Sequence, residues 1–181
     1  MNKKDFTFSV RDIAEIAILS ALAIVLDTFV KIPFSLTGGS INFAMVPLFL
    51  IALHLGWFKG FISGAFIFGI ITCLIDGYGI ETYPLDYFVA FGSVAVVGAL
   101  RKFIIKDKIN VSSYAFYFCG ILIAFAIRLF GATVDGVILY ETGFIDSLIY
   151  NATYILPSFV VCCVILLPTL SVFNNLFKRL S

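Results

Sequence analysis

Residues 113–134 read SYAFYFCGILIAFAIRLFGATV and carry a single charged side chain, Arg128. A helix needs about 20 predominantly apolar residues to cross the roughly 30 Å hydrocarbon core of a bilayer, so this stretch predicts a transmembrane helix. The whole chain agrees, because 61% of its 181 residues are hydrophobic, 13% are charged and the mean hydropathy is +1.09. Soluble domains carry about a quarter charged residues. The sequence therefore indicates an integral membrane protein.

Further apolar runs lie on both sides of this stretch, separated by charged or Gly- and Pro-rich breaks. The predicted fold class is an all-α membrane protein, a six-transmembrane-helix bundle that forms one domain over residues 1–181. Its spans are expected at about 13–30, 41–55, 58–75, 83–100, 113–134 and 147–172.

Lys and Arg collect on one side of this predicted bundle, and the other side has only Lys31. Because basic residues favour the cytoplasmic side, both termini are expected to be cytoplasmic, which an even number of spans allows. The basic residues on that side are Lys3, Lys4, Arg11, Lys59, Arg101, Lys102, Lys106, Lys108, Lys178 and Arg179.

Seven of the 11 acidic residues segregate to the opposite, outer side, and Asp5, Asp12, Glu15 and Asp107 are left on the inner side. A mouth lined by one sign of charge concentrates ligands of the other sign, so this pattern favours cationic ligands. The alternative is that the acids only balance the positive-inside bias. These outer acids are Asp27, Asp76, Glu81, Asp86, Asp135, Glu141 and Asp146.

Three features place polar chemistry at membrane depth. Arg128 is an ionisable residue at membrane depth, where an unpaired charge is costly, so it is expected to have a functional or structural role. It is expected either to form an internal salt bridge with Asp135 or Asp86, or to contact a substrate. Asp86 and Tyr87, which open the fourth span, combine a hydrogen-bonding carboxylate with an aromatic ring. Asn151 offers a donor and an acceptor to a heterocycle, or else links neighbouring helices.

Small residues recur at helix-contact spacing in two spans: Gly60 and Gly64 in the third, Ala17 and Ala21 in the first. Such stripes allow helices to approach closely. They serve either internal packing or the docking of a partner.

No motif for catalysis or nucleotide hydrolysis occurs. The chain lacks a phosphate-binding GxxxxGK[ST] loop and an HExxH motif, and its single His54 and four Cys have no metal-site spacing. An enzyme and a metal centre are therefore not expected, and nothing indicates a nucleic-acid site. If the protein carries out an energy-requiring process, another chain must supply the energy.

With these features together, the chain resembles the substrate-binding (S) components of energy-coupling factor (ECF) vitamin transporters, most closely their thiamine-specific branch. EIAILSALA (15–23) resembles the alanine-motif helix, whose small residues contact the coupling subunit, at Ala17 and Ala21. The other similar segments are GGSINFAMVPLFLIALHLGWFKG (38–60), PLDYFVAFGSVAVVGAL (84–100), RLFGATVDGVILY (128–140) and DSLIYNATYILP (146–157).

The resemblance implies roles for individual residues. Asp86 would accept hydrogen bonds from a ring amine, and Asn151 would read a heterocycle edge. Tyrosine rings would stack, and the loop at 33–40 would act as a lid. The implied substrate-binding residues are Asp86, Tyr87, Arg128, Asp135, Gly136, Tyr140, Asp146, Tyr150 and Asn151.

The chain departs from the thiamine pattern at four places, one of which is Asp146, where that branch can carry Tyr. Ala132 stands where that branch carries a ligand-contacting His, and Gly38 or a neighbour stands where it carries a stacking Trp. Asn42 lies near an expected acidic position. The substrate is thus expected to be thiamine or a related cationic or aminopyrimidine compound.

The implied protein sits in the bacterial cell membrane as a multi-pass subunit without a cofactor of its own. Its partners would be a transmembrane coupling subunit and two cytoplasmic ATPases, which hydrolyse the ATP, and it would topple in the bilayer to release substrate. Alternatives are an S component for riboflavin, pantothenate, pyridoxine or a queuosine precursor, or a scaffold subunit of a membrane assembly.

Overall fold

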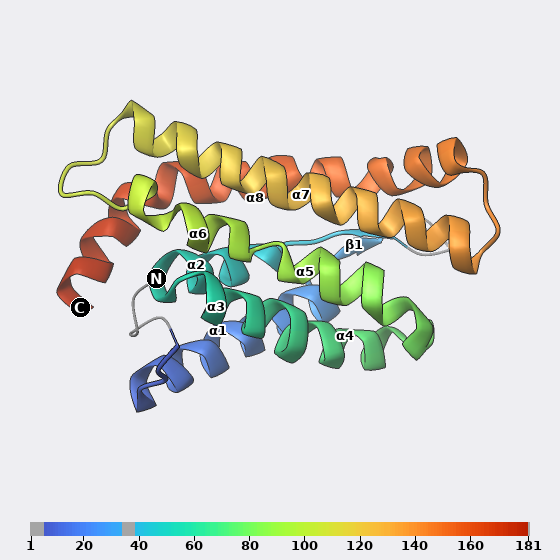
Figure 1. Ribbon diagram of the computed structural model, residues 1–181, viewed down its shortest axis with the longest axis horizontal. Coiled ribbons are helices and arrows are strands. Elements are labelled where there is room, and N and C mark those ends of the chain that lie inside the picture. Colours follow the sequence, from blue (N-terminus) through green and yellow to red (C-terminus); the bar gives the residue numbers. More distant parts are fainter. Residues whose placement is uncertain (1–5, 34–38, 181) are drawn as a thin grey trace.

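The computed structural model describes residues 6–33 and 39–180. Within them, six helices form an elongated bundle in which α7 and α8 run antiparallel along one side and α1 lies on the other (Figure 1). The first two helices are α1 (Val10–Phe29) and α2 (Met45–Leu55), and the last two are α7 (Val111–Leu139) and α8 (Phe144–Leu180). The third helix consists of α3 (Trp57–Phe61), the π-helical η2 (Ile62–Phe68) and α4 (Gly69–Asp76). The fourth consists of the 3₁₀ turn η3 (Ile80–Thr82), the π-helical η4 (Tyr83–Val89), α5 (Ala90–Gly92) and α6 (Ala95–Ile104).

Four of these helices are long and apolar enough to cross a membrane, namely those at 57–76, 80–104, 111–139 and 144–177. The α2 helix has only 11 residues, which is roughly 16 Å at a rise of about 1.5 Å per residue. The α1 helix has 20 residues but includes Arg11, Asp12, Glu15 and Asp27. The span limits and the single-domain assignment stay predictions.

Side-chain caps explain where two helices begin. Ser9 and Asp12 form a reciprocal capping box at the start of α1, and the Asn110 side chain accepts from the Ser113 amide at 3.0 Å at the start of α7. The α8 helix continues past the predicted apolar limit at 172 to Leu180. The apolar run ends at residue 172, but neither Gly nor Pro follows it up to Leu180, so nothing in the sequence stops the helix there.

A short antiparallel strand pair was not predicted. It joins β1 (Ile32–Pro33) to β2 (Ser40–Ile41), with Ile32 opposite Ile41 and Pro33 opposite Ser40. Each strand is too short to produce a recognisable alternation of apolar and polar residues. Pro33 and Ser40 of this pair contribute to the lining of the first cavity described below.

The two small-residue stripes have different surroundings. A Cβ at Gly64 would collide with the carbonyl oxygen of Phe91, and one at Gly60 would collide with Ala52. These glycines therefore serve internal packing. Ala17 and Ala21 are instead exposed on α1, so this stripe remains available to a partner.

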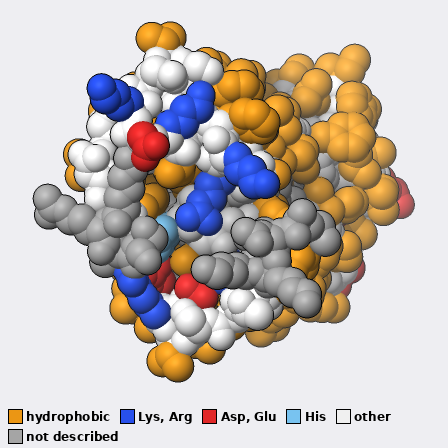
Figure 2. All heavy atoms as spheres, turned by 60° about the vertical axis from the view of Figure 1, so that its left-hand side comes forward, with side chains coloured by type: hydrophobic (Ala, Val, Ile, Leu, Met, Phe, Trp, Pro, Cys, Tyr) orange, Lys and Arg blue, Asp and Glu red, His pale blue; other side chains and the backbone are white. Residues whose placement is uncertain are grey.

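The two ends of the bundle differ in charge. Lys and Arg side chains gather on the end that carries the α6–α7 connection and the chain terminus (Figure 2). Outer acids lie at the opposite end, where α1 and α4 finish and α8 begins. The described basic residues around the α6–α7 connection are Arg101, Lys102, Lys106 and Lys108.

Candidate functional site

Two adjoining cavities occupy the acidic end of the bundle. The first has a volume of about 250 Å³ and the second about 430 Å³. Both are lined by Gly39, Tyr78, Asp86 and Tyr154, so they meet along these residues. Gly39 has φ +75°, a conformation that glycine adopts without strain, and a Cβ there would strike the Tyr154 ring.

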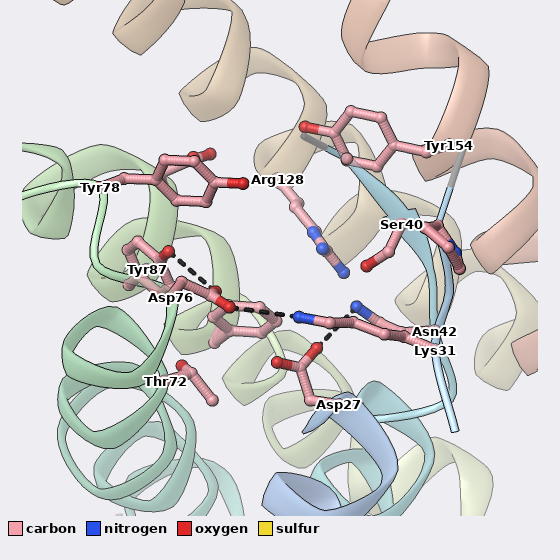
Figure 3. A pocket seen from close by; sticks show the side chains of 14 residues that line it. Asp27, Lys31, Ser40, Asn42, Thr72, Asp76, Tyr78, Tyr87, Arg128 and Tyr154 are labelled. Atoms are coloured by element: carbon pink, nitrogen blue, oxygen red, sulfur yellow. Dashed lines mark hydrogen bonds and ion pairs between the residues drawn. The ribbon is translucent and has the colours of Figure 1, made fainter. Parts of the chain in front are cut away.

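A hydrogen-bonded network fixes most charges of the first cavity (Figure 3). Lys31 Nζ donates to Asp76 Oδ1 at 3.2 Å, and the Tyr87 hydroxyl donates to Asp76 Oδ2 at 3.0 Å. Asn42 Nδ2 donates to Asp27 Oδ1 at 2.9 Å. Burial lowers the pKa of Lys31, but the Asp76 and Asp27 carboxylates outweigh this effect and raise the pKa above its ordinary value. Lys31 is therefore charged, and two of the carboxylates already have donors.

Arg128 forms neither of its predicted salt bridges. No ion pair joins it to Asp135 or Asp86 among the described residues, although Arg128 is only 8% exposed. Its guanidinium Cζ lies 4.8 Å from the centre of the Phe91 ring instead, and its Nη1 has no acceptor. Both predicted pairings were therefore wrong. For Asp135 the reason is that it lines the second cavity whereas Arg128 lines the first; Asp86 lines both cavities but forms no ion pair with Arg128.

Asp86 and Asp135 are likewise without a hydrogen-bond donor among the residues that the structure describes. Asp86 lines both cavities, and Asp135 is 3% exposed and lines the second. Carboxylates removed from water need donors or a cation to offset the lost hydration. The pair therefore leaves negative charge available to a ligand.

Asn151 links α7 to α8 beside the second cavity. Its Nδ2 donates to the Ala132 carbonyl at 3.2 Å and to the Ser147 carbonyl at 2.9 Å, and its Oδ1 accepts from the Tyr154 hydroxyl. Only the bond to Ala132 joins the two helices, as expected of an amide in a membrane bundle, because Ser147 and Tyr154 belong to α8 itself. What the amide retains for a ligand is one lone pair on Oδ1.

Every residue predicted for the substrate site lines one or both cavities; whether it contacts a ligand stays a prediction. The sequence did not assign Lys31, Asn42, Asp76 and Tyr154 to the site, although Asp76 belongs to the outer acids. Gly38, and most of the expected lid at 33–40, lie outside the described residues. The first cavity includes Tyr87 and Arg128, and the second includes Asp135, Gly136, Tyr140, Asp146, Tyr150 and Asn151, with Asp86 in both.

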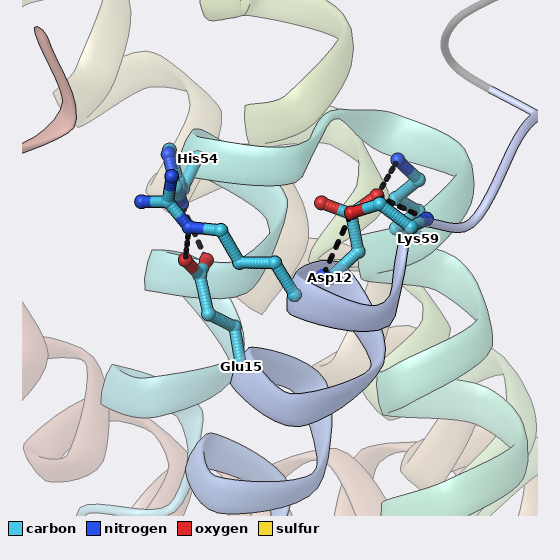
Figure 4. Close-up of polar contacts among 6 residues, drawn as sticks. Asp12, Glu15, His54 and Lys59 are labelled. Carbon is cyan, nitrogen blue, oxygen red and sulfur yellow. Dashed lines mark hydrogen bonds and ion pairs between the residues drawn. The ribbon is translucent and has the colours of Figure 1, made fainter. Parts of the chain in front are cut away.

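The far end of α1 is tied to the rest of the bundle (Figure 4). Lys59 Nζ lies 2.9 Å from Asp12 Oδ2, and His54 Nδ1 lies 2.7 Å from Glu15 Oε2. The His54 ring also stacks on Phe177 of α8, with ring centres 4.2 Å apart. Within the described residues no group of His, Cys, Asp and Glu has the geometry of a metal site. The Asp12–Lys59 and Glu15–His54 contacts hold α1 against the bundle, and the Ala17 and Ala21 stripe of α1 stays exposed.

Comparison with known proteins identifies the family. The family model described as "Thiamine transporter protein (Thia_YuaJ)" matches residues 13–178. This chain belongs to the thiamine transporter protein family. A curated relative, "Thiamine transporter ThiT" of Bacillus subtilis (strain 168), is 34% identical over 170 residues, covering 84% of this chain and 86% of the relative. A solved structure of ThiT from Listeria monocytogenes has the same fold, with a TM-score of 0.75, 22% identity, and coverage of 93% of this chain and 97% of that one.

Membership of the thiamine transporter family confirms the resemblance drawn from the sequence. The chain is a multi-pass membrane protein of a transporter family and not of an enzyme family. The likeness to the ThiT structure confirms the all-α fold with six helices. A substrate-binding member of this family needs no cofactor of its own.

Proposed function

We propose that this chain is an S component that captures thiamine at the acidic end of the bundle. The proposal rests on Asp86 and Asp135, two carboxylates that line the cavities of a thiamine transporter family member and have no hydrogen-bond donor among the described residues. Thiamine carries a permanent positive charge on its thiazolium ring and an exocyclic amine on its pyrimidine ring. Both groups are attracted by a carboxylate without donors.

The charges favour the second cavity for the cationic ring. Asp86, Asp135 and Asp146 line it, and none of its described lining residues is Lys or Arg. Tyr140 and Tyr150 also line it, and aromatic faces attract cations as well as flat rings. In the first cavity, Lys31 and Arg128 offset part of the charge of Asp27, Asp76 and Asp86.

The orientation and the partners belong to the same proposal. The basic end supports placing both termini in the cytoplasm, which puts the cavities on the outer side of the membrane. A transmembrane coupling subunit would dock on the exposed Ala17 and Ala21 stripe, and two cytoplasmic ATPases would drive release. The chain would work in the lipid bilayer and would not engage nucleic acid.

A ligand screen by thermal unfolding separates thiamine from the other vitamins. A ligand that binds only the folded chain stabilises it by about 2.7 kcal/mol at 100 times its Kd. We expect thiamine to raise the unfolding midpoint of the purified protein, and riboflavin, pantothenate, pyridoxine and a queuosine precursor to leave it unchanged. A shift with one of these and none with thiamine would contradict the assignment.

A further inference from the structure

The connection between α6 and α7 carries a cluster of cations at the end of the bundle opposite the cavities. Four of the eight residues from Arg101 to Lys108 are Lys or Arg, and one, Asp107, is acidic. Lys102 and Lys108 are exposed and Lys106 is half-buried. None of these three lysines forms an ion pair with a described residue. Their charge is therefore available to an anionic group from outside the chain.

The fold holds this connection in place. Ile104 at the end of α6 is fully buried, and Ile105 and Ile109 pack against the core. The Lys106 carbonyl accepts from Asn174 Nδ2 of α8 at 3.0 Å. The lysines thus stand on a segment that is already ordered, so that an anion bound there does not have to order a loop.

Aromatic side chains border the lysines. Phe103 follows Lys102 directly and stacks on Phe116 of α7 with ring centres 5.0 Å apart, and both rings are exposed. Aromatic rings collect at the level of the lipid headgroups, and Lys side chains extend their charged ends from apolar surface into the polar layer. Figure 2 shows Lys and Arg side chains of this end beside hydrophobic surface. Such a border matches a phospholipid, whose acyl chains adjoin its headgroup.

We propose that the α6–α7 connection binds an anionic phospholipid. Lys102, Lys106 and Lys108 would attract the phosphate, and the Phe103–Phe116 pair would lie against the upper acyl chains. Each Lys near the surface favours an anionic headgroup by about fivefold, which corresponds to about 1 kcal/mol. A lipid fits better than a protein partner because the aromatic pair lies on two helices that are long and apolar enough to cross a membrane. The inference does not depend on thiamine binding.

A single fluorescent reporter tests the site. Trp57 is the only Trp of the chain, so Trp57→Phe combined with Phe103→Trp leaves one indole beside the lysines. The purified protein is reconstituted in vesicles that contain brominated phosphatidylglycerol or brominated phosphatidylcholine, since bromine quenches indole fluorescence on contact. We expect the quenching to show a preference for phosphatidylglycerol of more than about fivefold at low salt. Salt should weaken the preference by screening.

Substitutions of the lysines separate charge from the presence of the reporter. In the reporter protein, Lys102→Gln, Lys106→Gln and Lys108→Gln together should reduce the preference below about twofold, because the attracting charges are gone. The matched control replaces the same three lysines with Arg, which keeps the charge and should keep the preference. If the triple Gln variant does not fold, Lys102→Gln with Lys108→Gln replaces it, since both side chains are exposed.

A second reporter distinguishes a local site from the field of the whole basic end. Ile13 is exposed near the start of α1, on the other side of the bundle from α7 (Figure 1). Ile13→Trp in the Trp57→Phe chain should show less than about half the preference measured at Phe103→Trp.

Three results overturn the lipid site. They are no preference at Phe103→Trp, an equal preference at Ile13→Trp, and an unchanged preference after the three Gln substitutions. If the first of these comes with lost thiamine uptake in the triple Gln variant, the connection binds a protein partner instead of a lipid.

Discussion

Asp86→Asn should weaken thiamine binding by about 3 kcal/mol, a factor of about 100 in Kd, since the change removes a full charge and a strong acceptor. Asp86 lines both cavities and has no donor among the described residues, so no bond within the protein is lost. Asparagine has nearly the same shape and keeps one acceptor oxygen. Isothermal titration calorimetry on the two purified proteins measures the difference, and their unfolding midpoints without ligand should agree.

The matched control is Glu81→Gln, which removes an acid from the same end of the bundle. Glu81 is exposed and lines neither cavity. Its contribution is a screened long-range attraction, so the loss should stay below about twofold. Equal losses in the two variants would show that only the overall field attracts the ligand, and an unchanged Kd in Asp86→Asn would remove Asp86 from the site.

The double substitution Ala17→Trp and Ala21→Trp should abolish uptake while leaving thiamine binding intact. Both alanines are exposed on α1 and line neither cavity, and two indole rings there would block close helix approach. Uptake of labelled thiamine by cells that contain the coupling subunit and the ATPases should fall more than about tenfold, as expected when the close packing of a helix interface is lost. The Kd of the purified variant should match wild type.

Leu122→Trp is the control for the added indole. Leu122 is 45% exposed on α7, outside the proposed docking stripe. The same ring placed there should leave uptake near wild type. Normal uptake in the double variant would mean that the partner docks elsewhere, and a matching loss in Leu122→Trp would mean that any added ring on the surface disturbs transport.

The helices were predictable because run length and charge placement are local properties of the sequence. Apolar runs located all six helices, and the outer acids indicated which end holds the polar site. Helix limits were less accurate, as at α8, because the apolar run ends at 172 whereas helical geometry continues to Leu180. The strand pair at Ile32–Pro33 and Ser40–Ile41 gave no signal, since each strand has only two residues.

The internal partners of the site were not predictable, because they depend on how helices rotate against one another. Helical spacing put Arg128 and Asp135 on similar faces, yet Arg128 packs on Phe91 and the two residues line different cavities. The Lys31–Asp76 and Asn42–Asp27 contacts join segments far apart in the sequence or separated by a loop. The residues that the motif resemblance implied all line one or both cavities, and their contact with a ligand stays a prediction.

The central claim is that this chain binds thiamine at the acidic end of its bundle. Titrating thiamine into the purified, unmodified protein in a calorimeter tests it most directly. The account predicts saturable binding with one thiamine per chain, weakened in Asp86→Asn. A folded protein that shows no saturable binding of thiamine would contradict it.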